Sequence, residues 1–248
     1  MANKSFPKGR RRPRIAEHTR ISEAAGHDGA QDDALLLALK QGGGDPAASA
    51  AVEARLRWHL ERSHFAQAQR LAEALLRCHP DATPILNNLS QIDSLRGRNQ
   101  EALTLIERIL VLDPDNLHAN ANAIRALVLS GRVIEARARV ERLMALPNTL
   151  LDAYVKKAEA LSYLGEDEQV LALFAEAEAK GRSDGYLYHL AACAALGRGQ
   201  DAEAAVLWRQ ALRSSPDLQS AAENLTDLNQ PPGERQGPWP FPIGQWVS

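Results

Sequence analysis

Four glycines recur every 34 residues, and this spacing restricts the possible folds more than any other feature of the sequence. They are Gly97, Gly131, Gly165 and Gly199. An alanine column and a proline column share the period: Ala68, Ala102, Ala136 and Ala204, with Val170 in the missing place, and Pro80, Pro114 and Pro216, with Pro147 one residue early. A fixed period of this length indicates stacked structural units, each packed on its neighbours.

Each column has a physical role in a pair of antiparallel helices. Apolar residues recur every three or four positions on both sides of Gly97, which predicts two amphipathic helices joined at that glycine. Glycine supplies the left-handed conformation that ends the first helix. Ala102 allows the second helix to approach the first closely, and Pro114 ends the second helix.

A 34-residue helix pair with small residues at these places and a closing proline resembles the tetratricopeptide repeat. The resemblance implies an all-α fold: a right-handed superhelical α-solenoid of stacked antiparallel helix pairs. When Pro114 is taken as position 32 of its repeat, five repeats are predicted, at 49–82, 83–116, 117–150, 151–184 and 185–218.

The ends of the chain need separate interpretations. Residues 15–48 are considered as a degenerate first repeat because Gly29 fits the glycine column, although the stretch before Gly29 is a poor helix. Residues 219–230 are expected to form a capping helix, since a solenoid must cover the apolar face of its last unit. Residues 1–14 are expected to be a basic, disordered arm.

Composition and charge limit the class of protein. The chain has 248 residues, of which 45% are hydrophobic and 24% charged, and no window resembles a membrane span or a signal peptide. We therefore predict a cytoplasmic protein. Residues 1–20 carry a net charge of +6 while the whole chain carries −2. Nucleic-acid binding through this arm is disfavoured because the arm lacks interleaved aromatic residues and the rest of the chain is acidic.

The sequence contains no pattern of residues that indicates catalysis. It has no glycine-rich phosphate loop after a strand, no paired histidines at helical spacing and no nucleophile elbow. Cys78 and Cys193 lack neighbouring Cys or His at metal-ligand spacing. We therefore predict that the chain is not an enzyme and holds neither a cofactor nor a metal.

The resemblance implies that the first helix of each pair lines a concave face, and that this face binds a protein or an extended peptide. Asn88 and Asn122 share repeat position six, and an Asn amide can donate to and accept from a peptide backbone at once. The pattern is similar to the asparagine ladder of O-linked N-acetylglucosamine transferases, although only two rungs match, and the carboxylate clamp of other family members is not reproduced. The alternative is that these residues simply cover an exposed helix face. The candidate residues are Arg57, Asn87, Asn88, Gln91, Asn122, Arg125, Lys156 and Glu159.

A Pro-rich tail at 231–248 concentrates large aromatic residues, namely Trp239, Phe241 and Trp246. Its prolines forbid a helix and favour an extended conformation. Three interpretations are open: the tail docks on the last repeats, it is a linear motif for another protein, or it begins a further domain.

These observations predict a non-catalytic adaptor or scaffold that binds a protein or peptide on the concave face of the solenoid. The alternative is a helper region of a larger enzyme, similar to the repeats that precede the catalytic domains of some glycosyltransferases and sulfotransferases. Fold alone does not distinguish the two.

Overall fold

The computed structural model describes the backbone of residues 25–240 and the side chains from residue 29 onward. Within this part of the chain there are twelve α-helices and no strand, as the predicted all-α fold requires. The helices are α1 (Ala25–Gln41), α2 (Pro46–Glu61), α3 (Phe65–Cys78), α4 (Thr83–Leu95), α5 (Asn99–Leu112), α6 (Leu117–Leu129), α7 (Val133–Ala145), α8 (Leu151–Leu164), α9 (Asp167–Ala179), α10 (Gly185–Gly197), α11 (Asp201–Ser214) and α12 (Gln219–Leu228).

The periodic glycines lie in the turns between paired helices, and their predicted left-handed conformation is confirmed. The φ angles of Gly97, Gly131, Gly165 and Gly199 lie between +69° and +77°. The first pair has Ser63 in the same column, and Ser63 adopts a φ of +57°. A side chain in this region of φ is strained, so the turn between α2 and α3 has a less suitable residue than the later turns.

The alanine column forms the contact surface inside each pair. Ala68, Ala102, Ala136 and Ala204 are completely buried, and so is Val170, which replaces alanine in the fourth pair. Successive helices contact one another in order along the chain, from α1 with α2 to α11 with α12. The apolar side chains therefore form a row of clusters between neighbouring pairs.

The first helices of the later pairs start at regular intervals. α4, α6, α8, α10 and α12 begin at residues 83, 117, 151, 185 and 219, which are 34 residues apart. α2 begins earlier than the predicted residue 49, because the Asp45 side chain caps its N-terminus and Pro46 occupies its first turn.

The N-terminal segment differs from a helix pair. Residues 1–24, which include the predicted basic arm, lie outside the described residues. The rest of segment 15–48 contains one long helix, α1, which continues through Gly29. Gly29 therefore does not occupy a turn, and its match to the glycine column gives no helix pair in the described part of this segment.

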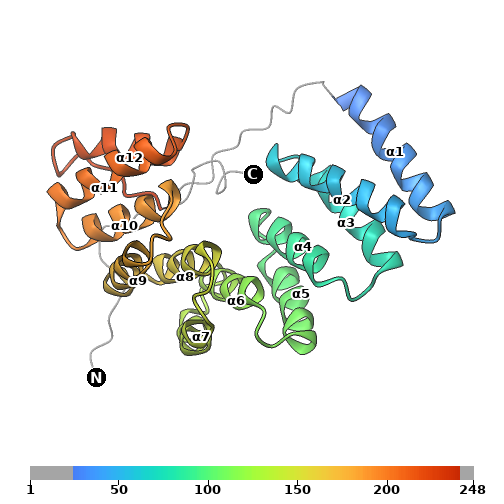
Figure 1. The fold of residues 1–248 in the computed structure, drawn as a ribbon, viewed down its shortest axis with the longest axis horizontal. Coiled ribbons are helices and arrows are strands. Elements are labelled where there is room, and N and C mark those ends of the chain that lie inside the picture. The colour runs from blue at the N-terminus through green and yellow to red at the C-terminus, as the bar shows by residue number, and fades with distance from the viewer. Residues whose placement is uncertain (1–24, 241–248) are drawn as a thin grey trace.

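The helices follow one another along an arc, with α1 at one end and α12 at the other (Figure 1). On this arc α4, α6 and α8 line the inner side, and α5, α7 and α9 lie on the outer side (Figure 1). α6 also packs directly on α8, and α8 on α10. The protein is an α-solenoid, which confirms the predicted fold class. We use the term inner face for the surface formed by α2, α4, α6, α8, α10 and α12.

Candidate functional site

Asn88 and Asn122 lie one repeat apart on the inner face, on α4 and α6. Both side chains are half-buried. Neither side-chain amide has a hydrogen-bond partner among the residues that the structure describes. A half-buried amide retains its capacity to donate and accept, so each of these residues can pair with the backbone of an added segment.

Arg125 lies on α6 beside Tyr163 of α8, and its guanidinium is only partly used. Nε and one Nη are buried without a hydrogen-bond partner within the described part of the chain. Burial raises the pKa of the Tyr163 hydroxyl, and the nearby Arg125, which hydrogen-bonds to it, opposes this increase. Unpaired buried donors are costly, so this arrangement of Arg125 is unfavourable as long as Nε and that Nη have no acceptor.

Lys156 and Glu159 are paired with each other on α8. Lys156 Nζ lies 2.8 Å from Glu159 Oε2, and the Tyr186 hydroxyl donates to Glu159 Oε1 at 3.1 Å. This carboxylate also contributes to raising the pKa of Tyr186, although burial is the larger cause. Both predicted residues are therefore present on the inner face, but their charged groups are already paired with each other, and Glu159 also accepts from Tyr186.

The other predicted residues on α2 and α4 differ in their surroundings. Asn87 Nδ2 donates to Asn116 Oδ1 at 3.2 Å, and Asn116 in turn caps the N-terminus of α6. This side chain therefore holds two helix pairs together. Arg57 and Gln91 are exposed and have no side-chain hydrogen bond to any residue that the structure describes.

The described part of the tail, residues 231–240, folds back onto the last helices. Asn224 of α12 forms two hydrogen bonds with the backbone of Trp239: its Nδ2 donates to the carbonyl oxygen at 2.9 Å, and its Oδ1 accepts from the amide at 2.7 Å. Asp227 of α12 accepts from the amides of Gln236, at 3.1 Å, and Gly237, at 2.8 Å. These bonds hold the segment against α12, and the Gly237–Pro238 peptide bond within it is cis.

His189 of α10 binds the next part of the tail. Trp208 Nε1 donates to His189 Nδ1 at 3.2 Å, which leaves the proton of the neutral ring on Nε2. His189 Nε2 therefore donates to the carbonyl oxygen of Pro240 at 3.1 Å. Burial lowers the pKa of His189 to about 4, although the backbone carbonyl of Pro240 and that of Trp239 oppose this decrease.

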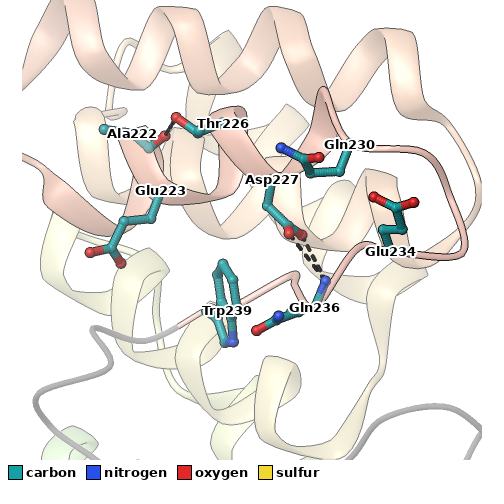
Figure 2. A pocket seen from close by; sticks show the side chains of 8 residues that line it. All are labelled: Ala222, Glu223, Thr226, Asp227, Gln230, Glu234, Gln236 and Trp239. Carbon is teal, nitrogen blue, oxygen red and sulfur yellow. Dashed lines mark hydrogen bonds between the residues drawn. The ribbon is translucent and has the colours of Figure 1, made fainter.

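Trp239 is half-buried and borders an open pocket of about 760 Å³ between α12 and the tail. In Figure 2 its ring lies on one side of this pocket with Gln236, and Glu223, Thr226 and Asp227 of α12 lie on the other. Phe241 and Trp246 lie outside the described residues, so the predictions made for them stay predictions.

Sequence reasoning missed Asn224 and Asp227, although the period identifies both. Asn224 lies three periods after Asn122, at repeat position six, and Asp227 lies three periods after Arg125, at position nine. His189 occupies position five, as Asn87 does. The residues that bind the tail thus occupy the positions predicted for the inner face.

Two other features bear on the type of site. In residues 25–240 there is no group of three or more His, Cys, Asp or Glu side chains placed to hold a metal ion. No helix within these bounds combines the length and the apolar character that crossing a membrane requires.

The arrangement described above is the tetratricopeptide-repeat (TPR) fold. The crystal structure of TTC0263, a thermophilic TPR protein of Thermus thermophilus, matches with a TM-score of 0.64 and 16% sequence identity, over 73% of this chain and 98% of that chain. MamA from residue 41 onward, from Desulfovibrio magneticus RS-1, matches with a TM-score of 0.47 and 15% identity, over 68% and 96%. YrrB, described as a TPR protein with an unusual peptide-binding site, matches with a TM-score of 0.44 and 14% identity, over 77% and 97%.

The sequence itself matches no protein-family model and no curated protein. The likeness to TTC0263 therefore supports the fold, and it confirms the resemblance to TPR proteins at that level.

Proposed function

We propose that the inner face formed by α4, α6 and α8 binds an extended segment of another protein through the backbone of that segment. The observation that carries this proposal is the pair of hydrogen bonds between Asn224 and the backbone of Trp239. Asn88 and Asn122 occupy the same repeat position as Asn224, and their amides have no partner among the described residues. The same residue type at the same position of a repeated unit can make the same pair of bonds.

Arg125 adds a charged contact on α6, three residues after Asn122. Its positive charge can attract a carbonyl oxygen or a carboxylate of the segment, and a hydrogen bond to the two buried donors requires that they become accessible on binding. A neutral hydrogen bond contributes about 1 kcal/mol and a charged one about 2 kcal/mol. Two Asn pairs and one Arg contact then give roughly 6 kcal/mol of favourable contacts, from which the cost of association and of ordering the segment is subtracted, so we expect weak affinity. An affinity of this size suits an adaptor that exchanges its partners.

Selection of peptides from a random 12-residue phage library on the full chain tests the proposal. We expect selected peptides to bind the wild-type chain and to lose at least 10-fold in affinity when Asn88→Ala, Asn122→Ala and Arg125→Ala are combined. Circular dichroism should show the same helical content in both chains, because the two Asn side chains support no internal hydrogen bond among the described residues and Arg125 loses only its contact with the Tyr163 hydroxyl, which lies between two helices.

The matched control replaces exposed polar residues on the outer helices α5 and α7, with Gln100→Ala, Glu101→Ala and Glu141→Ala combined. This variant should bind the selected peptides like the wild type. If no peptide binds the wild type, or if the inner-face variant keeps full affinity, the inner face is not the binding site.

A further inference from the structure

The tail is bound to the solenoid in a way that does not depend on most of its side chains. From residue 236 onward, the hydrogen bonds that His189, Asn224 and Asp227 make with the tail all go to backbone atoms. A site that pairs with the backbone accepts any segment whose chain follows the same path. The tail thus occupies a site with the properties of a peptide-binding site.

The site nevertheless restricts the residue at position 237. A Cβ added to Gly237 would lie 2.9 Å from Asn224 Oδ1 and 3.1 Å from Asp227 Oδ2. Both atoms already bind the tail backbone, so neither can move away without losing those bonds. The segment that fits this site therefore needs glycine at this place.

The next residues of the tail also match the site. Asp227 binds the amide of Gly237 and Asn224 binds the amide of Trp239, and each of these residues is followed by a proline, Pro238 and Pro240. Proline has no N–H, so neither position leaves a donor without an acceptor. Trp239 lies at the border of the open pocket, which leaves space for a large ring (Figure 2). The chemistry that fits is a Gly-Pro-aromatic-Pro segment that follows the path of the tail.

We propose that His189, Asn224 and Asp227 form a second peptide site, which the chain's own residues 235–240 occupy until a Gly-Pro-aromatic-Pro segment of another protein displaces them. This inference rests on the proposed function, because both use backbone pairing on the inner face, but it concerns α10 and α12 instead of α4, α6 and α8.

The hold on the tail is weak enough for exchange. A small number of hydrogen bonds must offset the conformational entropy of ordering the segment. The ion pair between Arg235 and Asp201, at 2.6 Å, adds little because the Asp201 side chain is 47% exposed. A short linker gives the tail an effective concentration on the order of 1 mM. A free segment of equal affinity must therefore reach about this concentration to displace the tail, or it must bind more tightly.

The test uses a fluorescent peptide with the sequence of residues 234–242, ERQGPWPFP, and the full chain. In the Gly237→Ala chain the added Cβ should release the tail, and the labelled peptide should bind at least 10-fold more tightly than to the wild type. Adding Asn224→Ala to that chain should remove the gain. A peptide with alanine in place of its glycine should not bind any of the chains.

Gly233→Ala is the matched control, because a Cβ at Gly233 meets no atom within 4 Å. That chain should bind the peptide like the wild type. Trypsin cleavage after Arg235 measures release of the tail directly, and it should be faster in Gly237→Ala than in Gly233→Ala. Equal cleavage rates would contradict the need for glycine and overturn the proposal.

Two further outcomes would overturn it. Peptide binding that survives Asn224→Ala would place the peptide elsewhere, and dimers of the wild type formed through exchanged tails would assign the site to a second copy of the chain. The Asn88, Asn122 and Arg125 substitutions should leave binding of the tail peptide to the Gly237→Ala chain unchanged. Failure of this second site therefore remains distinguishable from failure of the α4, α6 and α8 site.

Discussion

The buried, neutral His189 should make the folded chain lose stability in mild acid. Its pKa is lowered from 6.5 to about 4, mainly by burial. Between these two values the unfolded chain binds a proton that the folded chain does not. The contribution of His189 is therefore fully present above pH 6.5 and is lost as the pH falls toward 4.

The size of the effect follows from the difference between the two pKa values, 6.5 and about 4. Each pKa unit corresponds to about 1.4 kcal/mol, so the linkage relation gives a loss of about 2 kcal/mol between pH 7 and pH 5. The contacts of the ring explain why it resists protonation. A proton on Nδ1 would face the Trp208 indole N–H, which is itself a donor. Two other titratable groups lie at the ring: the Cys193 thiol, whose Sγ lies 3.9 Å from Nε2, and Tyr186, whose ring stacks on the imidazole with the ring centroids 6.0 Å apart.

A non-titrating reference separates His189 from the carboxylates, which also titrate in this range. His189→Gln keeps a donor and an acceptor but does not take up a proton. In urea unfolding followed by circular dichroism, the stability difference between the wild type and His189→Gln should shift by about 2 kcal/mol against the wild type from pH 7 to pH 5.

The control for this experiment is His118→Gln, because His118 is exposed and lies 3.1 Å from Asp152. That variant should show a much smaller shift over the same pH range. A stability difference between the wild type and His189→Gln that does not change with pH would refute the neutral, buried state of His189.

Two further predictions concern local backbone structure, and urea unfolding measures both. Ser63→Gly should raise the free energy of unfolding by about 1 kcal/mol, because φ is +57° at Ser63 and glycine adopts this conformation without strain. Gly131→Ala should lower it by a similar amount, because φ is +77° at Gly131. No atom lies within 4 Å of the added Cβ, so the backbone conformation alone causes this loss. Changes of the same sign in both variants would contradict this explanation. Asp184→Ala should lower the free energy of unfolding by about 1 kcal/mol, since Asp184 caps α10 by accepting from the Leu187 amide at 2.8 Å. An unchanged stability would mean that another group or solvent satisfies this amide.

The helix pairs could be predicted from the sequence because their turns and crossings place strict requirements on the local backbone. A helix pair needs a residue with positive φ in its turn and a small residue where the helices cross, and only a few residue types satisfy these needs. Gly97 and Ala102 therefore indicate the fold by their identity and spacing. The same argument failed at Gly29, because a glycine that fits the column is also tolerated inside a helix such as α1.

The inner face was predictable only as a set of positions. Lys156 and Glu159 are three residues apart on one helix, which places them close enough to pair. The partner of Asn87 is Asn116, 29 residues away, and the contact depends on how one helix pair packs on the next. Periodicity alone thus identifies candidate side chains without showing which of them are already used.

The sequence by itself determined the helix pairs, their turns and their order, since each of these follows from local conformational preferences repeated every 34 residues. The path of the tail was decided by the tertiary structure. Five prolines between 231 and 242 exclude a helix but leave the direction of the chain open. Asn224 and Asp227 bind the tail backbone over only 15 and 10 residues of sequence. His189 lies 51 residues before Pro240, so its hydrogen bond can form only after stacking has brought α10 and the end of the chain together.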